Sequence, residues 1–285
     1  MITAPFDYHS PKSVTEAVAL LEQYGSNAKI LAGGQSLIPL MKLRLAEPEI
    51  LVDLADIPSM SYIREKDSGL AIGGMTTYKE IESSGILPKA LSEAAGLVAD
   101  PQVRNRGTIG GSLAHSDPAA DLPAPVIALG GQIIATSKDG DRTIPSEDFF
   151  TDLFSTALTD EELITEVFIP KPSSETGTAY CKFGNKASHY AVAGVAASLT
   201  VDKSGTCIGA RIGVTGTGPS AYRAIKSETI LVGTKLDQDS IQEAGASILE
   251  NTPVNEDVHA SSEYRAHLTK VYAVKALVLA SSRAK

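Results

Sequence analysis

Cysteine is scarce and tryptophan is missing in this 285-residue sequence. The two cysteines, Cys181 and Cys207, have no cysteine neighbours, and two thiolates cannot complete the four-ligand sites of structural zinc or of iron–sulfur clusters. No metal site is therefore expected within the chain. Two reduced thiols in strand-like segments are the simplest interpretation, and they favour a cytoplasmic protein.

Long apolar runs and clusters of basic residues are also missing. No segment approaches the ~20 apolar residues of a transmembrane helix, and the first residues lack the charged start and apolar core of a secretory signal. The formal net charge is −9, and scattered Lys and Arg argue against nucleic acid or an anionic membrane as the main partner. The 43% hydrophobic fraction is that of a globular protein. At roughly 150 residues per domain, the length predicts about two domains.

Motifs of self-contained catalysis are not found. The sequence has no Gly-x-Ser-x-Gly elbow, no His-Glu-x-x-His and no phosphate loop that ends in Lys-Ser or Lys-Thr. The five histidines do not cluster along the chain. No catalytic residue is therefore predicted, and a bound cofactor is expected to carry any chemistry.

Helix and strand patterns alternate in the N-terminal part. Ser13 with Glu16 and Thr77 with Glu80 form capping boxes that predict helix starts. Pro101 ends a further helix, and an irregular segment rich in Gly, Ser, Asp and Pro is expected after it. The predicted elements are helices at 13–25, 76–85, 87–98 and 120–131, strands at 29–33, 50–53 and 161–170, and a hairpin at 131–144.

The segment KPSSETGT at 171–178 contains no apolar residue and is the best domain boundary. We expect domains at 1–174 and 175–285. Beyond the boundary strands precede helices: strands are predicted at 179–183, 191–201 and 207–216, and helices at 239–250 and 262–280.

Two glycine-rich segments are the most distinctive features, AGGQS at 32–36 and TIGGS at 108–112. Backbone N–H groups without Cβ bulk around them can point at phosphate oxygens, and serine hydroxyls can add donors. Two such segments can grip a pyrophosphate from both sides, and Asp121 can accept from a ribose hydroxyl. Each glycine pair can equally mark a turn or bulge, and the residues alone leave both interpretations open.

A family resemblance rests on four segments: ILAGGQSLIPLMKLRLAEPEILVDLADI, IGGMTTYKEIE, VADPQVRNRGTIGGSLAHSDPAADLPA and EELITEVFIP. With them the sequence resembles the FAD-binding medium subunits of molybdenum hydroxylases. Examples of this family are the medium subunits of aerobic carbon monoxide dehydrogenase and of bacterial N-heterocycle dehydrogenases, and the corresponding module of xanthine dehydrogenase. The match runs from about residue 6 to the C-terminal helix.

The resemblance implies an α+β fold. Its N-terminal FAD-binding domain is expected to be of the PCMH or vanillyl-alcohol-oxidase type, with two small α/β parts. Its C-terminal domain is expected to combine a three-stranded antiparallel sheet with a helical bundle.

The resemblance also implies a role in electron transfer. A large partner subunit would hold molybdopterin and hydroxylate the substrate, a small one would carry two iron–sulfur clusters, and this chain would hold FAD non-covalently. The FAD would pass electrons to an external acceptor. The assembly is expected to be a dimer of heterotrimers without a membrane span, in the cytoplasm or docked at the inner face of the membrane.

FAD-contacting residues follow from the resemblance as well. Asp121 should hold the ribose or adenine end, Leu163 and Lys182 should border the flavin, and Tyr190 should cover the exposed side of the ring. The full set is Ala32, Gly33, Gly34, Gln35, Ser36 and Leu37 in the first pyrophosphate motif, Thr108, Ile109, Gly110, Gly111 and Ser112 in the second, and His115, Asp121, Leu163, Lys182 and Tyr190 further on.

The sequence departs from the family pattern beside Tyr190. The family often has Arg-Lys-x-Gly-Asp-Tyr, whereas this chain has NKASHY at 185–190, so the cover over the flavin is expected to differ. Two other functions stay open. One is a stand-alone flavin oxidoreductase of the same fold, and the other is a non-catalytic assembly subunit whose glycine turns are structural.

Overall fold

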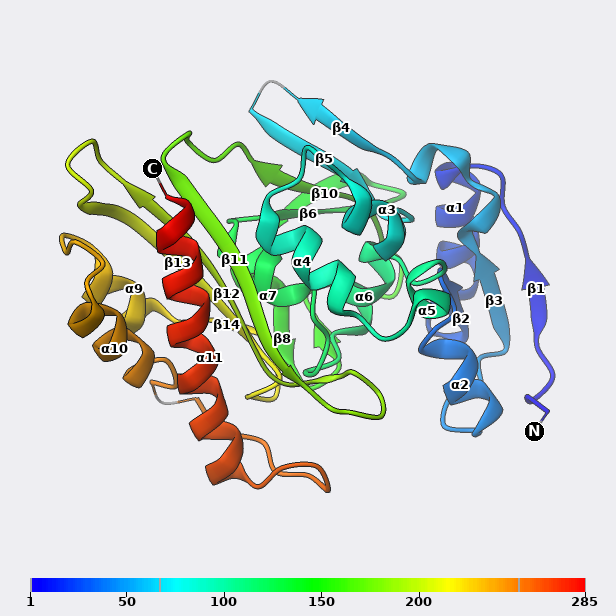
Figure 1. Ribbon diagram of the computed structural model, residues 1–285. Helices are drawn as coiled ribbons and strands as arrows, with labels where there is room; N and C mark the ends of the chain where they lie inside the picture. The colour runs from blue at the N-terminus through cyan, green and yellow to red at the C-terminus, as the bar shows by residue number, and fades with distance from the viewer. Residues whose placement is uncertain (1, 67, 251, 285) are drawn as a thin grey trace.

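The computed structural model describes residues 2–66, 68–250 and 252–284. Its elements form three groups along the chain (Figure 1). A small N-terminal group lies at one end of the molecule, and a four-stranded sheet with the long helix α11 (Ser262–Arg283) lies at the other. A central group with a five-stranded sheet separates them.

The N-terminal group is a sheet of three parallel strands in the order β1-β3-β2, covered by α1. Ser13 caps α1 by accepting from the backbone N–H of Glu16, and Gly25 ends this helix at a φ of 51°, which confirms the predicted helix. Its apolar face lies in the same buried cluster as the sheet. The elements are β1 (Asp7–His9), α1 (Val14–Tyr24), β2 (Ala28–Leu31), α2 (Leu37–Lys42) and β3 (Ile50–Asp53).

The central group is an antiparallel sheet in the order β4-β5-β10-β6-β7. The predicted capping box of Thr77 and Glu80 is complete at the start of α3. The strands are β4 (Ile63–Lys66), β5 (Gly69–Gly73), β6 (Gln132–Ser137), β7 (Gly140–Pro145) and β10 (Leu163–Pro170), with the separate hairpin β8 (Phe150–Asp152) and β9 (Ser155–Thr156). The helices are α3 (Tyr78–Ser83), α4 (Lys89–Leu97), α5 (Pro101–Arg104), α6 (Ile109–His115), α7 (Pro123–Ala128) and α8 (Ser146–Phe149).

The prediction of an irregular segment after Pro101 was wrong. Two short helices, α5 and α6, lie there, and α6 runs through the second glycine segment. Thr108 starts α6 because its hydroxyl accepts from the backbone N–H of Gly111 at 3.1 Å. The buried side chains of Ile109 and Leu113 then anchor the helix in the central core, which outweighs the poor helix propensity of two glycines.

The C-terminal group is an antiparallel sheet in the order β11-β12-β13-β14, with α11 packed along β11 and β12. The three long strands and two long helices confirm the expected order of strands before helices. Sequence patterns did not predict the two-residue edge strand β14. The elements are β11 (Thr176–Gly184), β12 (Ala191–Val201), β13 (Cys207–Thr215), β14 (Tyr222–Arg223), α9 (Ile225–Leu231), α10 (Gln238–Ala246) and α11.

The central and C-terminal groups meet without a gap. A Cβ atom on Gly213 would lie only 2.0 Å from the carbonyl oxygen of Ala124, so α7 rests directly on β13. Tyr180 and Ala196 from the C-terminal sheet belong to the central hydrophobic cluster. This packing brings the loop between β11 and β12 to the central helices.

Candidate cofactor site

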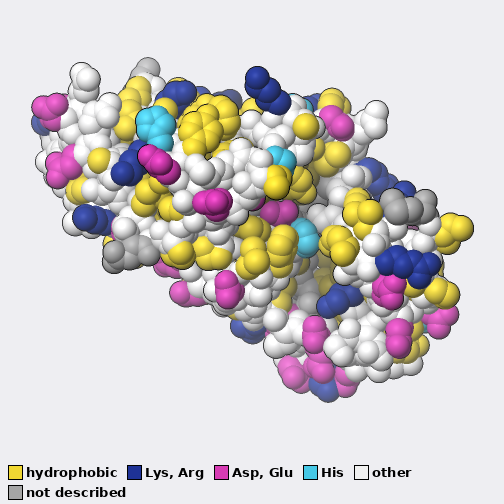
Figure 2. Space-filling model, turned by 90° about the horizontal axis from the view of Figure 1, so that it is seen from below, with side chains coloured by type: hydrophobic (Ala, Val, Ile, Leu, Met, Phe, Trp, Pro, Cys, Tyr) yellow, Lys and Arg dark blue, Asp and Glu magenta, His cyan; other side chains and the backbone are white. Residues whose placement is uncertain are grey.

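Two neighbouring cavities form an elongated site. The larger, about 420 Å³, lies between the loop after β2, helix α6 and the segment at 158–164. The smaller, about 240 Å³, continues toward Asp121 and Tyr190. Figure 2 shows the molecular surface hollowed between the N-terminal group and the rest of the chain. The residues that line both cavities, and so mark the waist between them, are Gln35, Ser36, Tyr78, Ser112 and His115.

The first glycine segment offers unused backbone donors to this site. In the described part of the chain, the backbone N–H groups from Gly33 to Leu37 have no intramolecular acceptor. Gly34 has a φ of 73°, a conformation that glycine adopts without steric cost. The loop therefore presents a run of free N–H groups to the larger cavity, the type of backbone concavity that binds anions.

Close backbone packing explains two other glycines. A Cβ atom on Gly33 would lie 2.2 Å from the carbonyl oxygen of Arg106, and one on Gly110 would lie 2.6 Å from that of Gly74. Both distances are too short for a real contact. These two glycines allow close backbone contacts, so one glycine of each motif is needed for packing within the protein.

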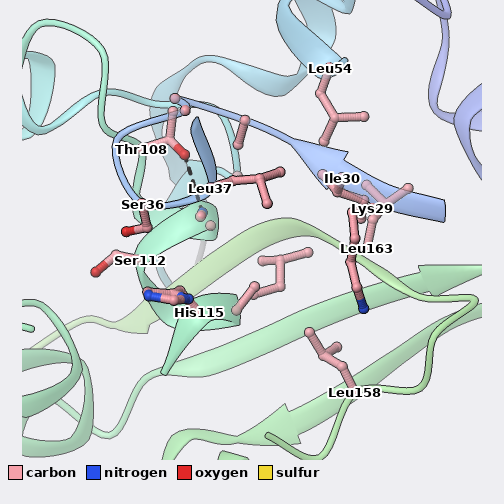
Figure 3. A pocket seen from close by; sticks show the side chains of 18 of the residues that line it. Lys29, Ile30, Ser36, Leu37, Leu54, Thr108, Ser112, His115, Leu158 and Leu163 are labelled. Carbon is pink, nitrogen blue, oxygen red and sulfur yellow. Dashed lines mark hydrogen bonds between the residues drawn. The ribbon is translucent and has the colours of Figure 1, made fainter. Parts of the chain in front are cut away.

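Four backbone N–H groups of the second glycine segment, those of residues 109–112, already donate within the protein. The N–H groups of Ile109 and Gly110 donate to Thr76 and Gly74 carbonyls, and those of Gly111 and Ser112 donate to Thr108. The expectation that both segments present N–H groups was therefore wrong for the second. What this segment presents is the Ser112 hydroxyl, which lies on the same side of the pocket as the hydroxyl of Ser36 (Figure 3).

His115 stands at the end of α6, beside both serines (Figure 3). Burial lowers the pKa of its imidazole, so the ring is neutral near pH 7 and can donate or accept a hydrogen bond. Its ring centroid lies 5.2 Å from that of Phe154. Phe154, at a φ of 51° in the turn between β8 and β9, also lines the larger cavity, and no sequence pattern pointed to it.

Apolar side chains form the far wall of the larger cavity. Leu163 faces the pocket together with Ile30, Leu54 and Leu158 (Figure 3). Lys29 is the cation of this wall, 3.9 Å from Asp160. This wall therefore offers apolar contacts to a ligand.

A buried ion pair lies behind the smaller cavity. The Asp121 carboxylate accepts from the Tyr180 hydroxyl at 2.6 Å and from the Lys182 ammonium at 2.9 Å. Burial raises the pKa of the Asp121 carboxyl, and both partners oppose that rise. Asp121 lines the smaller cavity, whereas Lys182 lines neither cavity in the described part of the chain.

The structure brings most of the predicted residues together, but in an arrangement that differs from the expected one. Tyr190 is 48% exposed and lines the smaller cavity with Asp121, although Asp121 was expected at the opposite end of the cofactor. Leu163, expected beside the flavin like Tyr190, lines the other cavity. Most residues of the two glycine segments line the larger cavity: Ala32, Gly33, Gly34, Leu37, Thr108, Gly110 and Gly111. Ile109, by contrast, is buried in the core.

The chemistry of the lining fits a dinucleotide cofactor. Free N–H groups and two serine hydroxyls gather at the waist, where a pyrophosphate needs donors, and a cavity extends on each side for the two ring systems. Within the described residues no group of three or more His, Cys, Asp or Glu is placed to hold a metal ion. The fold and the site thus define a protein that binds a dinucleotide cofactor outside the Rossmann class, because Gly-x-Gly-x-x-Gly is absent.

Comparison with known proteins identifies the family. Residues 4–172 match the FAD binding domain in molybdopterin dehydrogenase, and residues 178–280 match the CO dehydrogenase flavoprotein C-terminal domain. The chain therefore belongs to the FAD-binding subunits of the molybdenum hydroxylase family, and it is an FAD-dependent oxidoreductase subunit. The resemblance and the expected fold class are confirmed.

Individual relatives match over nearly the whole chain. The carbon monoxide dehydrogenase medium chain of Afipia carboxidovorans is 41% identical over 100% of both chains. Subunit alpha of the 6-hydroxypseudooxynicotine dehydrogenase complex of Paenarthrobacter nicotinovorans is 38% identical over 98% of this chain and 96% of its own length. The solved carbon monoxide dehydrogenase of Hydrogenophaga pseudoflava has a chain with a TM-score of 0.96 and 42% identity, with full coverage of both chains.

Proposed function

We propose that this chain takes electrons from the iron–sulfur clusters of a small partner subunit and passes them through FAD to an external acceptor. A large partner subunit with molybdopterin oxidises the substrate. The observation that carries this proposal is the elongated cavity with free N–H groups at its waist. When bound, FAD supplies the capacity to take up and release electrons.

The waist and the adjoining loop at 33–37 would hold the pyrophosphate. The N–H groups between Gly33 and Leu37 and the hydroxyls of Ser36 and Ser112 supply hydrogen bonds to it, and neutral His115 adds one more. In the described chain no Lys or Arg lines the waist, so backbone and hydroxyl donors replace the usual cation.

The two halves of the cofactor would occupy different cavities. Tyr190, an exposed aromatic side chain beside the smaller cavity, supports placement of the flavin there, where an external acceptor can approach. The adenosine half would then lie in the larger cavity against Leu163. This placement revises two expectations: Asp121 would lie near the flavin end of FAD and Leu163 near the adenosine end.

The wider assembly follows the names of the relatives. They are medium chains or subunits of complexes, which supports a multi-subunit assembly; we propose that it is a dimer of heterotrimers in the cytoplasm. No helix in the described ranges is both long and apolar enough to cross a membrane.

We also propose the division into domains at 1–174 and 175–285, supported by the change from the central sheet to the C-terminal sheet.

Flavin analysis of the purified complex, together with assays of the isolated chain, tests the function. The complex should be yellow and should release intact FAD on denaturation. The isolated chain should not oxidise substrate, because the proposal places substrate oxidation on the large partner subunit. Substrate turnover by the isolated chain would instead indicate the stand-alone oxidoreductase, and a colourless complex that still transfers electrons would indicate an assembly subunit.

A further inference from the structure

Lys182 is fully engaged by three separate parts of the chain. Its ammonium donates to the carbonyl oxygen of Leu97 at 2.7 Å, to the Asp121 carboxylate at 2.9 Å and to the carbonyl oxygen of His189 at 2.6 Å. A lysine ammonium has three N–H donors, so none is left for a cofactor. Its side chain is only 5% exposed. Lys182 is predicted to border the flavin, and its three hydrogen bonds are all to groups of the protein.

The loop at 185–190 carries Tyr190, and most of its hydrogen bonds lie within the loop. The Asn185 side chain accepts from the N–H groups of Ala187 and Ser188, and the Asn185 and His189 backbones bond within the loop. In the described chain, the bond from Lys182 to the His189 carbonyl is the one hydrogen bond that ties these six residues to the rest of the protein. The loop tip is exposed.

His189 is also strained. Its φ of 58° places a residue other than glycine in the left-handed region, which persists only where the surroundings enforce it. The buried ammonium contributes to that enforcement together with the bond from the His189 N–H to the Asn185 carbonyl, and a hydrogen bond to a charged group is stronger than a neutral one. The Asp121 carboxylate neutralises the Lys182 ammonium, and the hydrogen bond that it accepts from the Tyr180 hydroxyl holds this carboxylate in place.

We propose that Lys182 is a positioning residue that fixes Tyr190 at the smaller cavity through the His189 carbonyl, and thereby sets how much of the flavin the acceptor can reach. This inference rests on the proposed placement of the flavin in that cavity. It predicts that Lys182 acts only through Tyr190, so its loss changes flavin exposure and not cofactor chemistry directly.

Flavin fluorescence in the purified complex tests the proposal, because an aromatic ring packed on a flavin quenches its emission and shields it from iodide. Lys182→Met should raise both the emission of bound FAD and its quenching by iodide. Loss of a bond to a charged group should raise the population of displaced loop by roughly tenfold or more. Tyr190→Leu should change both signals in the same direction, and Lys182→Met combined with Tyr190→Leu should equal Tyr190→Leu alone.

Two further variants keep the test decisive. Lys182→Met with Asp121→Asn leaves no unpaired buried charge, so it provides the same measurement if Lys182→Met does not fold. Lys235→Met is the matched control, since Lys235 donates to the Ser204 carbonyl oxygen at 2.7 Å in a distant turn. The control should leave both flavin signals unchanged.

The outcomes separate this inference from the proposed function. Wild-type flavin signals in the folded Lys182 variants, or effects that add to those of Tyr190→Leu, would overturn the positioning role. Unchanged signals in Tyr190→Leu with FAD still bound would also overturn it, while the FAD function would stand. Absence of FAD from the wild-type complex would refute the proposed function itself.

Discussion

Replacement of Gly34 by alanine tests whether the loop after β2 binds the cofactor. At a φ of 73°, alanine costs about 1–2 kcal/mol in the left-handed region. Its Cβ would lie 2.7 Å from Cδ1 of Ile38, the movable end of a side chain, so the fold can accommodate it. Displacement of one N–H from the pyrophosphate should cost about 1.5–3 kcal/mol of binding, which corresponds to about 10- to 150-fold weaker FAD binding.

Gly205 supplies the matched control. It has a φ of 79° and no atom within 4 Å of an added Cβ, in the turn between β12 and β13. Gly205→Ala should therefore carry the same left-handed backbone cost and lower the Tm of the FAD-free protein, yet leave the Kd for FAD unchanged. Titration of FAD into the FAD-free chain measures the Kd of each variant, and thermal unfolding measures its Tm. Equal FAD affinity in Gly34→Ala and wild type, at equal loss of Tm, would refute the role of the loop.

Three further predictions concern the same region. Gly110→Ala should destabilise the fold itself, because its Cβ would lie 2.6 Å from the backbone oxygen of Gly74; urea unfolding at wild-type stability would contradict this. Ser36→Ala and Ser112→Ala should each weaken FAD binding by about 1.5–3 kcal/mol, because each removes a hydrogen bond to a charged group, and unchanged Kd values would exclude the hydroxyls from the site. The lowered pKa of His115 means that the unfolded chain binds more protons as the pH falls below about 6.5. The FAD-free protein should therefore lose stability in acid, and His115→Gln should reduce that loss; identical Tm profiles against pH would contradict it.

Local signals in the sequence were sufficient for many of the elements. The capping residues Ser13 and Thr77 mark helix starts through contacts only three residues away, and β3 occupies 50–53 as predicted. Helix α6 was not predicted because its two glycines have low helix propensity, and tertiary packing stabilises the helix in spite of them. Helix propensity carries no information on the burial of Ile109 and Leu113.

The site was predictable in its residues but not in its arrangement. The two glycine segments look alike in sequence, yet only the first keeps its N–H groups free, because Gly74 and Thr76 supply acceptors to the second. The partners of Lys182 include two backbone carbonyl oxygens, that of Leu97 far along the chain and that of His189 seven residues away, and any residue type can supply such an acceptor. The backbone strain at Phe154 likewise has no signature in the sequence.

The most direct test of the central claim is a crystal structure of the complex purified with its native cofactor. The account predicts FAD across both cavities, with the pyrophosphate at the N–H groups of residues 33–37 and the Ser112 hydroxyl, and with the flavin beside Tyr190. An FAD molecule bound elsewhere on the chain, or a pyrophosphate held by other groups while this loop stays free, would contradict it.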